Sequence, residues 1–234
     1  MGNTVPVHVS VIPDGNRRWA KRRGLKPWEG HAKAGTYDNL NALFQEAKRL
    51  GVKFISFWGF STDNWKREKK EVDIIMRLIL KGLNEFDEHV KEGIKFVHVG
   101  RKDRLLKRLV DRINALEEKT KNNDGLCVVL CLDYGGRDEI VRAVNTVLKE
   151  RKKSVDIEAF SSYLDTKNIP DPDLIIRTGG EMRTSGFMPF QSDYAELYFT
   201  DIYFPDFNAE ELKKAVQWFS DRDRRFGGDS GSER

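Results

Sequence analysis

The chain alternates short apolar runs with longer segments whose apolar residues recur at helical spacing. Six runs rich in β-branched and aromatic residues predict strands at residues 7–12, 53–59, 95–99, 127–132, 174–177 and 197–199. The segments between them predict helices at residues 18–23, 34–50, 71–91, 103–121, 137–149, 157–164 and 209–222. Strands that alternate with helices in this way are typical of an α/β fold, in which helices cover both faces of a mainly parallel sheet.

The segment 71–91 is apolar over most of its predicted helical surface. One stripe is continuous and further residues widen it, and the whole set is Val72, Ile74, Ile75, Met76, Leu78, Ile79, Leu80, Leu83, Phe86 and Val90. A helix of this kind is normally buried in the core. The same pattern also fits a helix that lines an apolar tunnel, and both interpretations stay open at this point.

Length and composition predict one globular domain. Of the 234 residues, 39% are hydrophobic and 33% are charged. We expect a single domain over residues 1–228 and a disordered tail at residues 229–234. No apolar run approaches the ~20 residues of a membrane span, and no secretory signal pattern opens the chain. We therefore expect a cytoplasmic protein, with contact to a membrane surface left open. Cys127 and Cys131 share one predicted strand and are expected to be buried thiols.

Basic residues are concentrated near the N-terminus. The net charge is +4, and residues 17–33 contain seven lysines or arginines against a single acid, Glu29. Such a run fits a site for an anionic small molecule, a nucleic-acid face or a solvated surface. Nucleic acid is the least favoured partner, because no aromatic stacking platform or groove-reading helix accompanies the basic residues.

The most informative turn follows the first predicted strand. Pro13 ends this strand, because proline cannot donate to the ladder. Asp14, Gly15 and Asn16 then form a turn, and Arg17 opens a helix. The free N–H groups at a helix N-terminus suit phosphate, and the Asp14 carboxylate suits a magnesium ion that bridges the same phosphates. The alternative is an ordinary turn in which Asp14 only caps the helix.

Three further loops after predicted strands mix arginine with glycine or hydroxyl residues. They span residues 60–67, 133–137 and 177–185. The carboxyl ends of parallel strands meet at one edge of a sheet, where ligands bind. Arginine forks and glycine backbone both match phosphate oxygens, so this edge predicts two phosphorylated substrates or one very anionic substrate. The chain has no Walker loop, GxGxxG fingerprint or GxSxG elbow, which argues against nucleotide hydrolysis and hydride transfer. It also has no Asp-Asp pair, so the Asp-rich DDxxD magnesium motif is absent.

Six blocks of the sequence together resemble the cis-prenyltransferase family, which includes undecaprenyl diphosphate synthase. The blocks are HVSVIPDGNRRWAKRRGL, EGHAKAG, FWGFSTDNWKREKKEV, LDYGGRDEI, DLIIRTGGEMRTSGFMPFQSDYAELYFTDIYFPDF and RDRRFGG. They follow the family order over nearly the whole chain, which makes the set far more specific than any one block. The resemblance implies a homodimer with a six-stranded parallel sheet, an undecaprenyl diphosphate synthase-like fold and a hydrophobic product tunnel.

The resemblance also implies an activity, namely the Mg²⁺-dependent addition of isopentenyl diphosphate to an allylic diphosphate of farnesyl or geranylgeranyl type, with a Z double bond made at each step. It assigns Asp14 as the catalytic and metal-binding carboxylate, Glu196 as the second metal-site carboxylate and Asn64 as a catalytic residue near the proton-removal step. It implies substrate binding by Gly15, Asn16, Arg17, Arg18, Trp19, His31, Ser61, Thr62, Asp63, Trp65, Arg67, Glu71, Arg177, Arg183, Thr184, Ser185, Arg225 and Gly227. The last two belong to a motif that reaches the active site of the partner subunit.

The resemblance divides these residues between two substrates. The turn after the first strand and His31 would hold the allylic diphosphate, whereas Arg177, Arg183 and Ser185 would hold isopentenyl diphosphate. Pro27 stands where an arginine is usual in the family, and Met182 where bacterial members often have a histidine. Two alternatives stay open. A head-to-middle (lavandulyl-type) synthase would share nearly every motif, and the unusual Pro27 and Met182 are compatible with it. A non-catalytic subunit of a heteromeric synthase would tend to lose the Asp14 turn and the arginine loops. The intact Asp14 turn and arginine loops favour a catalytic enzyme over the non-catalytic subunit.

Overall fold

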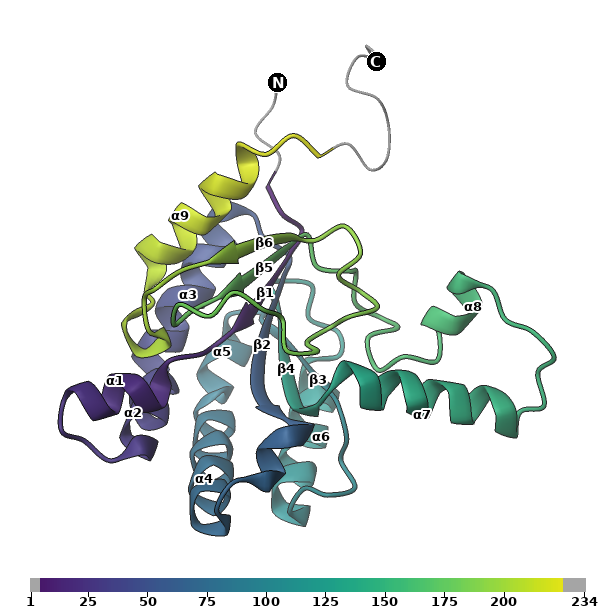
Figure 1. Cartoon of the computed structure of the whole chain (residues 1–234), viewed down its shortest axis with the longest axis horizontal. Coiled ribbons are helices and arrows are strands. Elements are labelled where there is room, and N and C mark those ends of the chain that lie inside the picture. The colour runs from purple at the N-terminus through teal and green to yellow at the C-terminus, as the bar shows by residue number, and fades with distance from the viewer. Residues whose placement is uncertain (1–4, 225–234) are drawn as a thin grey trace.

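A six-stranded, fully parallel sheet forms the centre of the molecule (Figure 1). The computed structural model describes residues 5–224. The strands are β1 (His8–Ile12), β2 (Phe54–Ser61), β3 (Lys95–Val99), β4 (Cys127–Tyr134), β5 (Leu174–Arg177) and β6 (Glu196–Phe199). They lie in the order β3-β4-β2-β1-β5-β6, and every neighbouring pair is parallel. The predicted α/β fold is therefore confirmed. Strands β2 and β4 each continue two residues beyond their predicted ends.

The helices follow the predicted pattern with two corrections. They are α1 (Asn16–Arg22), α2 (Pro27–Ala34), α3 (Tyr37–Leu50), α4 (Lys69–Glu85), α5 (Asp87–Lys91), α6 (Lys107–Thr120), α7 (Gly136–Lys149), α8 (Ile157–Ser161) and α9 (Ala209–Ser220), with short 3-10 turns η1 (Thr62–Lys66) and η2 (Phe204–Asp206).

The prediction of one helix over 34–50 missed α2, which begins with Pro27 at its first position, where proline is tolerated. The predicted helix over 71–91 is interrupted at Phe86, where Arg112 donates two hydrogen bonds to the Leu83 carbonyl at the end of α4.

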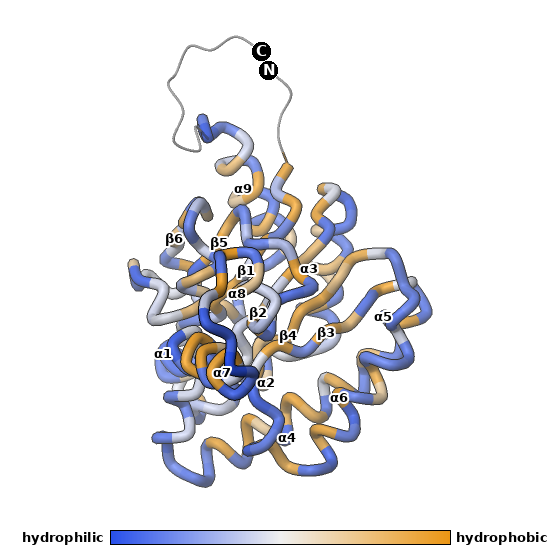
Figure 2. Tube along the Cα trace, turned by 90° about the vertical axis from the view of Figure 1, so that its right-hand side faces the viewer, coloured by the Kyte–Doolittle hydropathy of each residue, from blue (hydrophilic) through white to orange (hydrophobic). Residues whose placement is uncertain are grey.

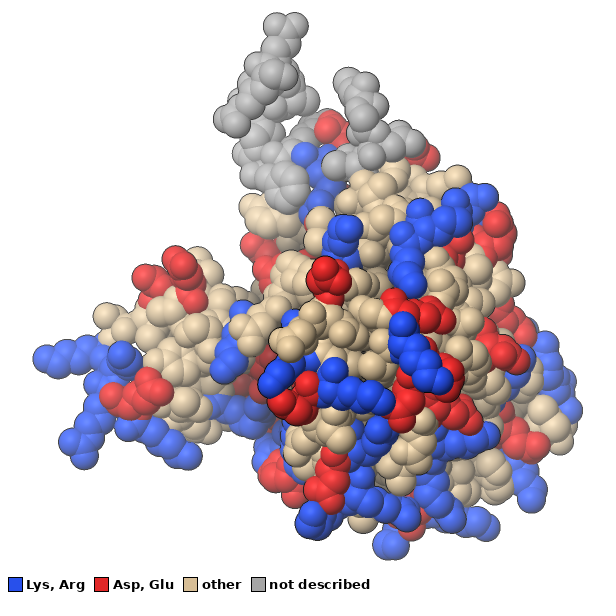
Figure 3. Space-filling view, turned by 180° about the vertical axis from the view of Figure 1, so that it is seen from behind, with Lys and Arg blue, Asp and Glu red and all other residues tan. Residues whose placement is uncertain are grey.

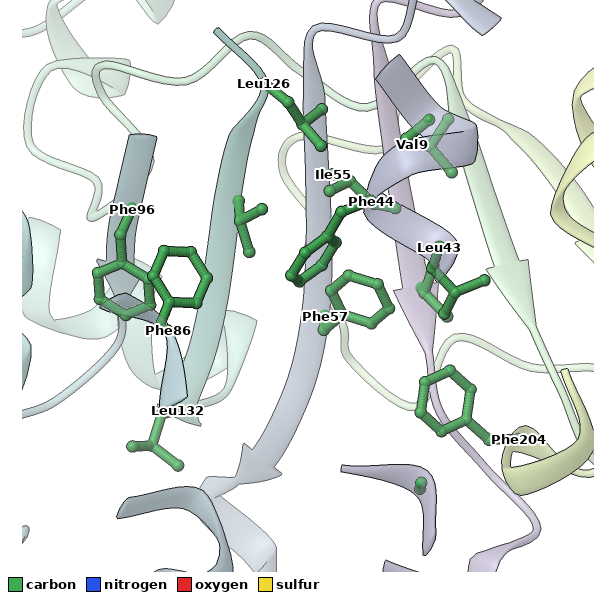
Figure 4. Packing of buried hydrophobic residues seen from close by; sticks show 14 of the residues in the cluster. Val9, Leu43, Phe44, Ile55, Phe57, Phe86, Phe96, Leu126, Leu132 and Phe204 are labelled. Atoms are coloured by element: carbon green, nitrogen blue, oxygen red, sulfur yellow. The ribbon is translucent and has the colours of Figure 1, made fainter. Parts of the chain in front are cut away.

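The main hydrophobic core lies between one face of the sheet and helices α3, α4, α6 and α9. Figure 4 shows part of this core, where Phe44 from α3 and Phe57 from β2 approach each other with ring centroids 6.0 Å apart. A smaller core on the other face contains Cys127 and Cys131, which are buried free thiols as predicted. Burial raises the pKa of Cys127 to about 11. Both faces of the sheet are therefore covered, as parallel sheets require.

Helices α7 and α8 project from the body of the molecule (Figure 1). Their surface carries apolar side chains that the chain itself does not cover, and α7 stands out as hydrophobic in Figure 2. These exposed residues are Val141, Val144, Leu148, Val155 and Ile157, the last 77% exposed. Within residues 5–224, no helix has both the length and the apolar composition needed to cross a membrane.

Candidate active site

The turn after β1 has a backbone that glycine makes possible. Gly15 precedes α1 with φ +95°, a backbone conformation that residues other than glycine rarely adopt. A Cβ atom on Gly15 would lie 2.5 Å from the Tyr203 ring, so the turn also needs glycine for space. Thr178, directly after β5, accepts a hydrogen bond from the Asp14 backbone N–H and donates one to the Asp14 carbonyl. The loops after β1 and β5 are thus joined at the carboxyl edge of the sheet.

The Asp14 carboxylate faces two arginines. Its Oδ2 atom accepts a hydrogen bond of 2.8 Å from Arg177, its Oδ1 atom lies 3.3 Å from Arg18, and the same oxygen accepts the Gly15 N–H. Burial alone would raise the pKa of Asp14. The hydrogen bonds from Arg177 and Gly15 and the charges of Arg177 and Arg18 outweigh burial and lower the pKa below its usual value of 3.8. Asp14 is therefore ionised at neutral pH.

The loop after β5 adds further charges. Arg177 is 6% exposed, and besides Asp14 it donates to Ser185 Oγ (2.9 Å) and to the Arg183 carbonyl. Glu181 pairs with both Arg18 and Arg183. The Nε atom of Arg177 is buried without a hydrogen-bond partner. We call Arg18, Arg177 and Arg183, together with Asp14, the arginine cluster. It confirms that the loops after β1 and β5 meet, as the sequence predicted.

A second polar group lies beside the arginine cluster, at the opening of a cavity. We call the polar side chains that line this cavity, those of Asn16, His31, Asn64 and Arg67, the cavity mouth. Burial, together with the positive charges of Arg67 and Arg17, lowers the pKa of His31 to about 4, so the ring is neutral near pH 7. The Nε2 atom of His31 and the Oδ1 atom of Asn16 are both buried without a partner. Buried polar atoms are normally satisfied, so two such atoms at one opening indicate a place for a polar ligand.

Glu71, near the start of α4, also lies beside the mouth and pairs with Arg17 (3.8 Å) and Arg67 (3.4 Å). The arginine cluster and the mouth together bring five guanidinium groups near three carboxylates. The two excess positive charges favour an anionic ligand.

The cavity itself is apolar and has a volume of about 230 Å³. Five phenylalanines from different elements line it: Phe44, Phe57, Phe86, Phe96 and Phe204. Figure 4 shows these rings along one side of the sheet, with Phe86 and Phe96 in edge contact at 5.2 Å. Helix α4 contributes Ile75, Leu78, Ile79, Gly82 and Leu83 to the wall. Helix α4 therefore packs in the core on one part of its surface and lines the cavity on another. Both interpretations of its apolar pattern, a core helix and a wall of an apolar tunnel, describe part of it.

Two predicted site residues lie elsewhere within the subunit. Glu196 is the first residue of β6 and pairs in register with Leu174, at the amino edge of the sheet, where it lies 3.5 Å from Arg222. Its expected place beside Asp14 is wrong for a single subunit, because parallel pairing puts the first residue of a strand at the edge opposite the site. Trp19 is buried, and its indole N–H donates to Asp206 (2.7 Å), so it anchors α1 to η2 and does not reach the arginine cluster.

The remaining predicted residues lie in the loops that the sequence indicated. Ser61 and Asn64 bond to each other at the start of η1, Asp63 pairs with Lys66 at the surface, and Thr62 packs against Gly135. Thr184 is partly buried between Arg183 and Ser185. Arg225, Gly227 and the predicted tail lie outside the described residues.

Sequence reasoning missed two residues of the site. Glu181 links Arg18 to Arg183, and Thr178 holds the Asp14 backbone. Both belong to the loop 177–185, whose mixture of arginine, glycine and hydroxyl residues was itself the available signal. The role of each residue depends on whether its side chain faces β1. Only the pairing of β1 with β5 in the folded chain shows which side chains do so.

The side chains present fit a magnesium ion held together with phosphates. In residues 5–224 no three carboxylate, imidazole or thiol side chains gather as they would around a fully protein-bound metal. Mg²⁺ commonly binds through one or two carboxylates and completes its shell with water and substrate phosphates. Asp14 supplies one ionised carboxylate beside arginines that suit those phosphates, so Asp14 is the residue that would hold the ion.

Comparisons with known proteins identify the family of the chain. The family model described as putative undecaprenyl diphosphate synthase matches residues 12–227. The isoprenyl transferase of Fusobacterium nucleatum is 43% identical over 229 residues, which cover 97% of this chain and 98% of that protein. The isoprenyl transferase of Aquifex pyrophilus is 42% identical over 228 residues, with 97% and 98% covered.

Two solved structures have the same fold. Lavandulyl diphosphate synthase from Lavandula x intermedia, in complex with dimethylallyl diphosphate, superposes with a TM-score of 0.90 at 35% identity, over 95% of this chain and 98% of that one. A probable undecaprenyl diphosphate synthase from Campylobacter jejuni gives 0.81 at 32% identity, over 96% and 99%. The chain belongs to the undecaprenyl diphosphate synthase family of prenyltransferases.

Proposed function

We propose that this member of the family is a Mg²⁺-dependent cis-prenyltransferase, which condenses isopentenyl diphosphate with an allylic diphosphate of farnesyl or geranylgeranyl type and makes a Z-polyprenyl diphosphate. One observation carries the proposal: a cluster of arginines around an ionised carboxylate lies directly beside the mouth of an apolar cavity. A molecule with a diphosphate head and a hydrocarbon tail suits both halves of this arrangement. A ligand that was only anionic would leave the apolar cavity without a role.

Each half of the site has a task in this reaction. Arg177, Arg183 and Ser185 bind the diphosphate of isopentenyl diphosphate, whereas the turn after β1 and the neutral ring of His31 bind the allylic diphosphate. The alkene of isopentenyl diphosphate attacks the allylic carbon, the allylic C–O bond breaks and diphosphate leaves. The adduct then loses a proton beside Asn64 to an oxygen of the released diphosphate, and the C–H electron pair forms the double bond. Guanidinium groups stabilise the charge that develops on the leaving diphosphate. A magnesium ion at Asp14 would supply further stabilisation of the same charge.

The direct test is incubation of the purified chain with radiolabelled isopentenyl diphosphate, an allylic primer and Mg²⁺, followed by chromatographic sizing of the products. We expect labelled products that carry several added five-carbon units, with no product after chelation of the metal. Absence of labelled product from a folded preparation with any of several primers would refute the proposal and favour a non-catalytic subunit.

A second candidate is head-to-middle coupling of two five-carbon units. The TM-score of 0.90 with a lavandulyl diphosphate synthase favours it. The two reactions differ in product, because head-to-middle coupling yields one branched ten-carbon diphosphate that does not grow further. Mass spectrometry after incubation with dimethylallyl diphosphate alone distinguishes them. A branched ten-carbon product identifies the second activity, whereas a requirement for isopentenyl diphosphate supports the first.

We also propose that the protein is a homodimer that pairs through the α7–α8 projection. Seen from behind in Figure 3, charged side chains border uncharged surface on this projection. Its exposed Leu148 and Ile157 would be covered by a second copy. Sedimentation velocity should give a dimer, and Leu148→Glu should give a monomer. A wild-type monomer at micromolar concentration would refute this pairing. A cytoplasmic location and contact with a membrane surface during product release stay predictions.

A further inference from the structure

The carboxyl end of β4 contains a buried carboxylate, Asp133, that neither substrate half uses. Asp133 is 0% exposed, is not part of the cavity wall, and has φ +52°, a rare conformation for a residue with a side chain. A buried charge is costly unless it is paired. Asp133 is therefore expected to have ion-pair or hydrogen-bond partners that offset the cost of burying its carboxylate.

Its partners come from two separate loops. Arg104 donates from Nε to Asp133 Oδ2 (2.8 Å) and from Nη2 to Oδ1, which makes a bidentate ion pair. Trp65, in η1, donates its indole N–H to Asp133 Oδ1 (2.8 Å). The guanidinium of Arg104 also lies over the Trp65 ring, 5.7 Å from its centroid. The three side chains thus form one unit.

The hydrogen bond from Trp65 attaches η1 to β4. The hydrogen bonds between Ser61 and Asn64 connect η1 only to the end of β2, directly before it in the chain. Among the residues that the structure describes, Trp65 to Asp133 is the side-chain hydrogen bond that joins η1 to β4, a strand distant from it in the sequence. Packing supports it, because the Trp65 ring meets Phe60 edge-on at 5.2 Å and a Cβ on Gly135 would lie 2.4 Å from Thr62 Oγ1.

Residues next to Trp65 lie at the cavity mouth. Asn64 precedes it directly, Arg67 follows two residues later, and both side chains border the cavity. A shift of η1 would therefore move both groups relative to a bound substrate. We infer that Asp133, held by Arg104, is a positioning residue that fixes η1 through Trp65 and so places Asn64 and Arg67 at the mouth. The kinetic consequence rests on the proposed function, whereas the structural consequence does not.

Hydrogen exchange of the backbone amides tests the structural part without substrate. Asp133→Ala should accelerate exchange of the amides in η1 by about tenfold, the effect of losing a hydrogen bond to a charged acceptor. Asp133→Asn should keep most of the protection, because asparagine tolerates positive φ and its amide oxygen still accepts the Trp65 N–H. Trp65→Phe removes the donor but leaves the ion pair, and it should match Asp133→Ala even if that variant folds poorly. The control is Asp165→Asn, which breaks another bidentate arginine pair, with Arg142, away from η1.

Steady-state kinetics tests the consequence for the reaction. Asp133→Ala should lower kcat about tenfold and change the KM for isopentenyl diphosphate less than twofold, because misplacement affects the transition state more than binding. Asp133→Asn should restore kcat to within threefold of the wild type. Wild-type exchange in η1 for Asp133→Ala and Trp65→Phe, or equal effects of Asp133→Asn and Asp133→Ala, would overturn the inference. Failure of the wild-type chain to form product would instead refute the proposed function and leave the exchange result standing.

Discussion

Replacement of Asp14 with alanine gives the sharpest test of the arginine cluster. The substitution removes the one carboxylate that Arg177 and Arg18 share and the group expected to hold the metal. Loss of one preorganised electrostatic group at a reacting centre commonly costs about 10²–10³ in rate. Loss of the metal adds to this, so we expect turnover to fall by at least ~10³. The assay is incorporation of labelled isopentenyl diphosphate at saturating concentrations of both substrates.

The same substitution should affect stability much less. Arg177 keeps Ser185 and the Arg183 carbonyl as partners, and the Asp14 side chain is 32% exposed, so solvent screens part of its interaction. We expect the free energy of unfolding to fall by about 1–2 kcal/mol, below the 3–5 kcal/mol of a fully buried pair. The low pKa of Asp14 makes its contribution complete above pH 3.8, and the contribution is lost only as pH falls through the lowered folded value. Urea unfolding at pH 7 measures it.

Asp206→Asn is the matched control for Asp14→Ala. Asp206 also pairs with an arginine, Arg23, and accepts the Trp19 N–H, but it lies outside the arginine cluster. This control should lower stability by about 1 kcal/mol and leave turnover within twofold of the wild type. If Asp14→Ala retains more than a tenth of wild-type turnover, or if the control loses as much, the reasoning fails.

Three further changes follow from the same geometry. Gly15→Ala should lower stability by about 2 kcal/mol and nearly abolish activity, because φ +95° strains alanine and its Cβ meets Tyr203; thermal unfolding and the incorporation assay measure both effects. Gly82→Leu should shorten the products, because Gly82 lines the cavity and a leucine side chain there would enter it. A Cβ on Gly82 meets only the Gly35 carbonyl, at 3.9 Å, so the backbone leaves room for the side chain; chromatographic sizing of the products tests this. The free energy of unfolding of the wild type should fall by about 2 kcal/mol between pH 7 and pH 5 because of His31, and His31→Gln should not show this part of the fall. The folded pKa of about 4 lies below the usual 6.5, so the unfolded chain binds the extra proton in this range, and unfolding at the two pH values checks it.

Most strands were predictable because each is a short, largely buried apolar run, a pattern that few other structures produce. Strand β6 lies at the edge of the sheet with Leu197 exposed, and its apolar residues alone indicated it. Helix α2 was missed because the residues from Pro27 to Ala34 contain no apolar stripe, and its burial depends on contact with α1 and α4. The break at Phe86 was also hidden, since the apolar stripe continues across it. Arg112, which binds the end of α4, comes from a distant helix and leaves no local signal.

The site was predictable where it depends on loop position and wrong where it depends on register. Arg177 ends β5 and Asp14 lies two residues beyond the end of β1, so parallel pairing alone brings them to one edge. Glu196 precedes its strand's apolar residues, and only the pairing of β6 with β5 shows that it begins the strand at the far edge. The partners of Asp133 come from loops about 30 and about 70 residues away, and no local spacing indicates them.

The strand order explains why one carboxylate can serve as the centre of the site. Strand β1 lies between β2 and β5, so the loops after these three strands are adjacent although they are far apart in the sequence. The loop after β5 brings Arg177 and Arg183 to Asp14 from one side, and the loop after β2 brings Asn64 and Arg67 from the other. Strand β4 borders β2 on its outer side, so Asp133 can hold η1 without entering the cavity. The diphosphate of isopentenyl diphosphate would therefore lie on the β5 side of Asp14, and the hydrocarbon chain of the allylic substrate on the β2 side, where Phe57 of β2 lines the apolar cavity.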